Sequence, residues 1–193
     1  MSPDTAVAER RPGRPRSEEA DRAIEASALD LLVADGFDGM TIEGVAARAG
    51  VGKATIYRRW PTKGQLVLDA VVHRCAEHII SPDTGSLHGD LVELFEALLV
   101  KFRRDGSILR AFAAATAKSA DLADTFQRTF LDERRSAMRD VLARGVARGE
   151  LPADADLELL GDLGSALMWH RLAISGAPLS DDLPQRLADV VCR

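Results

Sequence analysis

The feature that most constrains the fold of this chain is a pair of short helical segments joined by a glycine. Residues 41–60 read TIEGVAARAGVGKATIYRRW; Thr41 is a good N-cap, Gly50 breaks the first segment and Pro61 ends the second. Helices of about eight or nine residues are not stable alone in water and must pack on a third element. A tight turn with a small residue in it, followed by a second helix held at a steep angle, indicates a helix-turn-helix.

The rest of the chain also predicts helices. Apolar residues make up 46% of the chain and aromatic residues 5%, a composition that favours helices over strands. Ser17 is a good N-cap for a helix that Gly36 ends, and Thr62 with Gln65 has the spacing of a capping box that opens a helix of about 18 residues. Further helices are expected near residues 87–104, 107–118, 121–148, 155–175 and 181–191.

These elements predict an all-α fold of about nine helices. A three-helix head with the helix-turn-helix (residues 17–62) is followed by a larger helical-bundle body (residues 63–193). Residues 1–16 are polar, contain Pro, Gly and Arg, and show no periodicity. They are expected to form a disordered basic arm.

Charge is segregated along the chain. The net charge is −5, which alone would disfavour a polyanionic partner, but its distribution matters more than its sum. The arm carries Arg10, Arg11, Arg14 and Arg16. Residues 44–68 contain no acid and hold Arg48, Lys53, Arg58, Arg59 and Lys63. The sequence therefore predicts a local anion-binding surface on an acidic protein.

One face of the second short helix carries groups whose chemistry suits a contact with DNA. If Ile56 and Trp60 face inward, the outer arc contains two cations, two hydroxyls and one methyl group. These groups can contact phosphates, base acceptors and thymine methyls in a major groove. The outer residues are Lys53, Ala54, Thr55, Tyr57 and Arg58.

The segment TIEGVAARAGVGKATIYRRWPTKGQL (residues 41–66) resembles the signature of the tetracycline-repressor (TetR) family. The stretch over residues 147–179, which contains ARGELPADADLELL and WHRLAISGAPL, is similar to one C-terminal subgroup. The resemblance implies a homodimeric repressor that binds a pseudo-palindromic operator in double-stranded DNA and is released by a small-molecule effector. The body would then bind the effector and form the dimer, and the helices at 155–175 and 181–191 are the expected interface.

The resemblance also assigns roles to residues. Those matching phosphate contacts of the family are Thr41, Tyr57 and Lys63. Those matching readers of base edges are Lys53, Ala54 and Thr55. Arg58 stands where many members have His, and a phosphate contact is expected there.

The arm offers a second contact with DNA. Arg14 and Arg16 flank Pro15, which should keep the segment extended, a shape that fits a narrow minor groove. The alternative is a solvated basic tail, and the sequence leaves both open.

An effector pocket is implied by the resemblance, and the aromatic residues of the body are candidates for its walls. Each of them could instead belong to the core, and the last two could lie in the dimer interface. The candidates are Phe95, Phe112, Phe126, Phe130, Met168, Trp169 and His170.

Other functions find less support in the residues. His73 and His78 are separated by about 140° on a helix and do not share a face, so no metal site, cofactor or enzyme activity is expected. The N-terminus lacks the apolar region of a signal peptide, and no run reaches the roughly 18 apolar residues of a membrane span. A cytoplasmic, nucleoid-associated protein is expected.

Two alternatives stay open. One is a small helical enzyme or ligand carrier whose head no longer binds DNA; it would need a catalytic dyad or a metal cluster in the body. The other is an architectural DNA-binding protein that responds to no ligand, and it would have a filled body without a pocket. The effector, the operator and the sign of regulation are not predicted.

Overall fold

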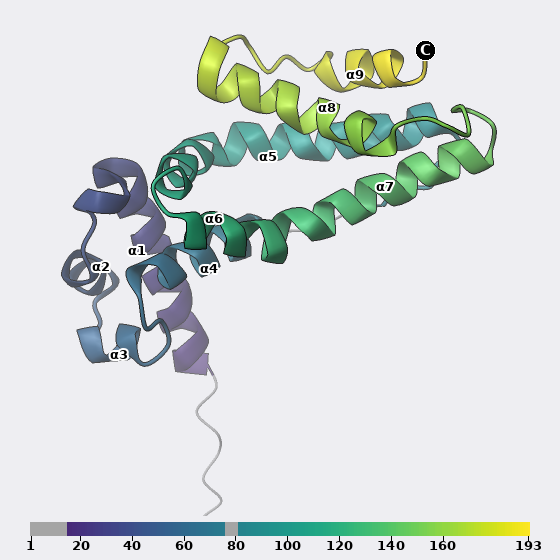
Figure 1. Cartoon of the computed structure of the whole chain (residues 1–193). Helices are drawn as coiled ribbons and strands as arrows, with labels where there is room; N and C mark the ends of the chain where they lie inside the picture. The colour runs from purple at the N-terminus through teal and green to yellow at the C-terminus, as the bar shows by residue number, and fades with distance from the viewer. Residues whose placement is uncertain (1–14, 76–80) are drawn as a thin grey trace, which may run out of the picture.

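The computed structural model describes residues 15–75 and 81–193, and within these residues all regular secondary structure is helical, without strands. The first four helices are α1 (Pro15–Gly39), α2 (Ile42–Ala49), α3 (Lys53–Tyr57) and α4 (Lys63–Cys75). The others are α5 (Leu87–Thr116), α6 (Ala120–Phe126), α7 (Asp132–Ala147), α8 (Leu157–His170) and α9 (Leu183–Val191). Two π-helical turns, η1 (Gln127–Leu131) and η2 (Arg171–Ser175), follow α6 and α8. Figure 1 shows α1–α3 at one end and the long helices at the other.

The helix-turn-helix forms where the sequence predicts it, but α3 is shorter than expected, because it ends at Tyr57 and not next to Pro61. The Thr41 hydroxyl accepts a hydrogen bond of 3.0 Å from the Gly44 backbone N–H, so Thr41 is the N-cap of α2. Gly50 ends α2 with a positive φ of 67°, a conformation that glycine adopts without strain. Ile42 and Val45 are buried against α1. The bounds of α2 are those expected from the sequence.

Both ends of α1 differ from the prediction, and Ser17 lies inside this helix and is not its N-cap. α1 begins at Pro15, so Pro15 and Arg16 belong to its first turn and not to an extended arm. Proline suits the start of a helix because its missing N–H would have no partner there. The helix then kinks at Gly36 (φ 70°), where the sequence predicts its end. Residues 1–14 lie outside the described residues.

The helices expected at 87–104 and 107–118 are one helix, α5. The sequence between them, Asp105-Gly106-Ser107, resembles a break, but tertiary contacts hold it in the helix. Asp105 is fully buried and forms ion pairs with Arg74 and Arg104. Gly106 leaves room for Leu172, which would lie 2.8 Å from a Cβ at that position.

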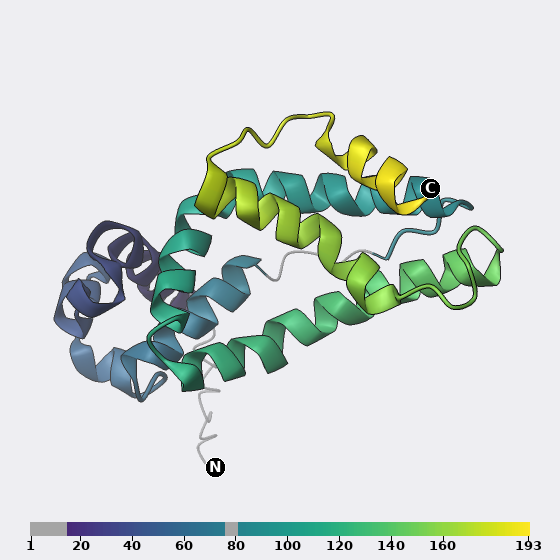
Figure 2. The same ribbon diagram turned by 45° about the horizontal axis from the view of Figure 1, so that its top comes forward.

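Two apolar cores lie at the two ends of the molecule. The first unites α1, α2 and α3 of the head with α4 and the C-terminal part of α5, so it continues beyond residue 62. The second fills the body between α5, α7, α8 and α9. In Figure 2, α8 runs obliquely between α5 and α7, and α9 packs against α5. None of the described helices combines the length and apolar character needed to cross a bilayer.

Candidate nucleic-acid interface and body cavity

The outward face of α3 is set by the residues that anchor its inward face. Ile56 is fully buried and Trp60 nearly so. The Trp60 indole Nε1–H donates a hydrogen bond of 3.0 Å to Asp69 on α4, which holds the end of α3 in place. The five residues predicted to face outward do so: Lys53, Ala54, Tyr57 and Arg58 are exposed and Thr55 is partly buried.

The cations of residues 44–68 form more ion pairs than the absence of acidic residues from that segment suggests. Acids from outside that window lie beside three of them, because packing brings α1 and the first turn of α2 close. The pairs are Arg48 with Asp30 (2.8 Å), Lys53 with Glu43 (2.9 Å), and Arg59 with Asp21. The hydrogen bond from Lys53 lowers the pKa of Glu43, and the same bond raises the pKa of Lys53. Both side chains are solvent-exposed, so a phosphate can compete for the ammonium.

Lys63 has a structural contact that its sequence position does not reveal. Its ammonium Nζ donates hydrogen bonds of 2.6 Å to the Phe37 carbonyl and 3.0 Å to the Met40 carbonyl. The ammonium also lies 4.6 Å from the centre of the Phe37 ring. Lys63 thus fixes the chain that leaves the end of α1. An ammonium has three N–H donors, so one is left for a phosphate.

Of the remaining predicted DNA contacts, the structure describes the side chain of Thr41 but not those of Arg14 and Arg16. Thr41 is exposed at the start of α2, and its hydroxyl hydrogen is available to a phosphate while its oxygen caps the helix. Arg14 lies outside the described residues. Arg16 belongs to α1, and its side chain lies outside the described part.

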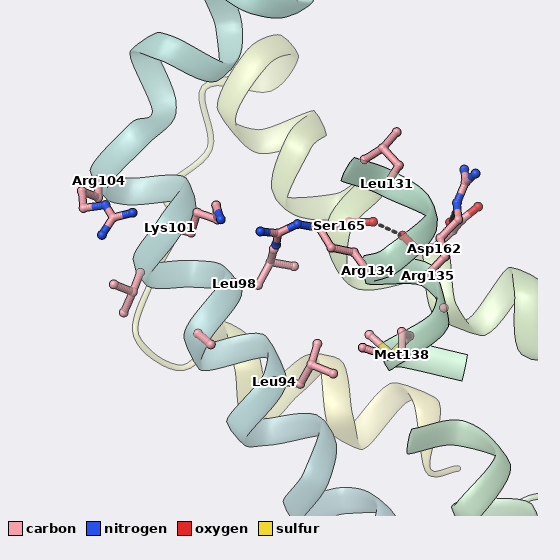
Figure 3. A pocket seen from close by; sticks show the side chains of 14 residues that line it. Leu94, Leu98, Lys101, Arg104, Leu131, Arg134, Arg135, Met138, Asp162 and Ser165 are labelled. Carbon is pink, nitrogen blue, oxygen red and sulfur yellow. Dashed lines mark hydrogen bonds and ion pairs between the residues drawn. The ribbon is translucent and has the colours of Figure 1, made fainter. Parts of the chain in front are cut away.

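The body contains a cavity of about 510 Å³ between α5, α7 and α8. Figure 3 shows its two characters: Lys101 of α5 and Arg134 of α7 point toward one another, while Leu94 and Met138 lie at the other end and Leu98 lies between. Its remaining lining residues are Ala97, Val100, Arg104, Leu131, Arg135, Ala137, Gly161, Asp162 and Ser165.

The residues expected in an effector pocket are not among those that line this cavity. Phe95 and Met168 are fully buried in the second core. Phe112 and Phe126 make an edge contact with centroids 4.8 Å apart. Trp169 is partly buried and packs on Phe102, and His170 is exposed. The Phe130 side chain lies outside the described part.

Among the cavity residues, Arg134 differs most from what the sequence suggests. With Glu133 and Arg135 it reads as a solvated face, yet it is partly buried and lines the cavity. A signal for the site exists on α5, where Leu94, Leu98 and Lys101 follow helical spacing and place a lysine on an apolar face.

The histidines that the structure describes bear on the predicted absence of a metal site. In the described residues, no group of three or more His, Cys, Asp or Glu side chains is arranged to hold an ion. His73 contacts Glu25 at 2.8 Å, and His88 contacts Asp189 at 2.9 Å. His78 lies outside the described residues.

With this geometry in hand, comparison with known proteins defines the class. Residues 24–70 match the family model of bacterial regulatory proteins of the TetR family. Residues 81–191 match the model of the tetracyclin repressor-like C-terminal domain. The chain therefore belongs to the TetR family of DNA-binding transcriptional regulators, and its all-α fold with an N-terminal helix-turn-helix is that of the family.

Individual relatives align with this protein along nearly the whole chain. YdeS, an uncharacterised HTH-type transcriptional regulator of Bacillus subtilis strain 168, is 34% identical over 88% of this chain and 86% of its own length. The DNA-binding transcriptional repressor TetR of Mycobacteroides abscessus is 34% identical over 91% of this chain and 93% of its own. The crystal structure of the TetR family transcription regulator SCO0332 superposes with a TM-score of 0.68 at 30% identity, covering 90% of this chain and 97% of that one.

Proposed function

We propose that this regulator is a dimeric repressor that leaves its operator when a small molecule binds in the body cavity. The observation that carries the proposal is the position of α4. Its apolar residues, among them Leu66, Val67 and Val71, belong to the core shared with the head. Its last carbonyl, that of Cys75, accepts hydrogen bonds from Lys101 and Arg134, which line the cavity. One helix thus contacts both the head and the proposed effector site.

Within this proposal, α3 enters the major groove. Lys53, Ala54 and Thr55 read base edges, and Thr41, Tyr57, Arg58 and Lys63 contact phosphates. Support comes from the exposure of the α3 residues and from the anchoring of Ile56 and Trp60 behind them. Arg14, which precedes α1 in the sequence, extends the contact to the minor groove, whereas Arg16 lies in the first turn of α1 and lacks the extended backbone on which this contact was predicted.

The dimer forms through α8 and α9. α8 is rich in large apolar residues, yet within the described chain only Met168 among them is fully buried. Leu159 is 61% exposed on α8, and Val190 is 60% exposed on α9. Exposed apolar residues on both helices, together with the incomplete burial of α8, support an interaction surface there. A second copy related by a two-fold axis would cover both helices and set the distance between two recognition helices.

The ligand-independent alternative predicts a filled body. A cavity of about 510 Å³ lined by both apolar and cationic side chains favours the effector-responsive reading instead.

Selection of bound fragments from random DNA duplexes tests the operator part of the proposal. We expect enrichment of a two-fold symmetric motif; the absence of any enriched sequence would contradict it. Sedimentation analysis tests the dimer. Leu159→Glu should give monomers, whereas Val33→Glu, a change at a partly exposed position of α1, should leave the dimer intact. A dimer that persists with Leu159→Glu would place the interface elsewhere.

A further inference from the structure

The body cavity has a cationic end that is built from two different helices. The Lys101 ammonium on α5 and the Arg134 guanidinium on α7 both donate to the carbonyl oxygen of Cys75, the last residue of α4. Lys101 is 9% exposed. The carbonyl groups at a helix C-terminus carry partial negative charge, which explains why two cations gather there.

The surroundings of this end are electropositive and largely dehydrated. Burial lowers the pKa of Lys101 to about 8, and Arg134 and Arg104 lower it as well, against the opposing influence of Cys75 and Asp105. Burial also raises the pKa of the Cys75 thiol. A fixed anion at this point would be attracted by both cations in a medium that screens charge poorly.

The opposite end of the cavity is apolar. Leu94 projects from α5 and Met138 from α7 at this end, and Leu98 of α5 lies between the two ends, as Figure 3 shows. Among the lining residues that the structure describes, the one acid is Asp162, which lies 4.0 Å from Arg135 and so faces a cation of its own. A single small anionic group joined to an apolar body matches this division, whereas a cation or a polyol does not.

We propose that the cavity binds an apolar carboxylic acid whose carboxylate lies between Lys101 and Arg134 and whose hydrocarbon part lies against Leu94, Leu98 and Met138. The inference rests on the proposed effector response, and it names the chemical class of the effector. The carboxylate competes with the Cys75 carbonyl for the two donors. Binding therefore loosens the C-terminal end of α4, the helix that packs against the head.

Calorimetric titration of the full-length protein tests the ligand class. Decanoate and 2-naphthoate serve as acids of two shapes, each compared with its alcohol (decan-1-ol, 2-naphthylmethanol) and its amine (decylamine, 2-naphthylmethylamine). At least one acid should bind about tenfold or more tightly than its alcohol, since charge-assisted hydrogen bonds distinguish them. The amine should bind more weakly still. Equal affinities of acid and alcohol, or no binding by either acid, would overturn the proposal.

Variants test the two cations. Lys101→Met and Arg134→Met should each weaken binding of the acid about tenfold or more and leave that of the alcohol nearly unchanged. Arg139→Met removes a cation from the same helix as Arg134 at an exposed position that does not line the cavity, and it should change neither affinity. Loss of acid and alcohol binding together would indicate that the substitution has damaged the cavity. The pH dependence of acid binding to the wild-type protein then tests whether Lys101 is the partner of the carboxylate.

The pH profile follows from the groups that face Lys101, which are Arg134 from α7, Cys75 from α4, and Arg104 and Asp105 from α5. The acid stays ionised, so its affinity should fall as the pH rises above about 8, where Lys101 loses its proton. Alcohol binding should stay level. A flat profile for the acid in the wild-type protein would exclude Lys101 as its partner.

Operator release is measured separately by fluorescence anisotropy. An acid that binds with the expected selectivity but leaves the operator complex intact would preserve the ligand class and refute the effector response. A protein that selects no operator would refute the proposed function and leave the calorimetric result standing.

Discussion

Lys63 stabilises the head through its contacts with the end of α1, and it is also one of the proposed phosphate contacts. Its ammonium Nζ donates to the Phe37 and Met40 carbonyls at 2.6 and 3.0 Å and lies over the Phe37 ring. Lys63→Met keeps a side chain of similar length and removes the charge and all three donors. The third donor is the one that we assign to a phosphate.

The expected loss of stability follows from these contacts. A hydrogen bond from a charged donor contributes about 1.5–3 kcal/mol when it is well buried. Lys63 is only partly buried, and the carbonyls that it leaves can turn to water, so we expect about 2 kcal/mol for the whole set. For a chain of this size that corresponds to a melting temperature lower by about 4–8 °C. Urea denaturation of the purified protein measures the loss in free energy of unfolding, and thermal unfolding measures the lower melting temperature.

The DNA contact is measured by the salt dependence of operator binding. Removing one phosphate contact should reduce the slope of log affinity against log salt by about one. Arg58→Met is the matched control: Arg58 is exposed, so its loss should reduce the slope similarly and change stability by less than about 0.5 kcal/mol. Unchanged stability with Lys63→Met would refute the structural role, and an unchanged slope would refute the phosphate contact.

Three further substitutions test the proposed base-reading role of α3, the packing of the body core and the loss of stability at low pH. Thr55→Ala should relax preference at one operator position in a competition among duplex variants; equal weakening for every sequence would reject the base-reading role. Gly164→Ala should destabilise the protein in thermal unfolding by about 1–2 kcal/mol, because overpacking exceeds the gain in helix propensity. A Cβ there would lie 2.7 Å from Cδ1 of the fully buried Phe95, and an unchanged melting temperature would show that the ring can move. Burial opposes the charge of Asp90, but hydrogen bonds, one of them from Arg148, hold its pKa below the ordinary value. The unfolded state therefore binds more protons in acid, and stability falls as the pH drops through the folded pKa. Asp90→Asn should make this fall shallower, by at most one proton, in urea titrations at several pH values, and an unchanged fall would exclude Asp90 as a contributor.

The sequence alone determines the helix-turn-helix. Thr41 and Gly50 act through local backbone chemistry, since a cap and a positive φ depend little on distant residues. The bounds of α2, the inward position of Ile56 and the outward face of α3 follow from these punctuating residues and from helical periodicity. The family assignment could be made for the same reason, because its signature is a local sequence.

Tertiary structure decides the rest, because long-range contacts determine which helices continue and which charges meet. α5 runs through Asp105 and Gly106 because Arg74 and Leu172, distant in sequence, occupy the space around them. The cavity lies where Lys101 and Arg134 approach the end of α4 from two helices. Local periodicity reports which face of a helix is apolar, but it carries no information about the partner that this face meets, so only the packed chain distinguishes a core phenylalanine from a cavity wall.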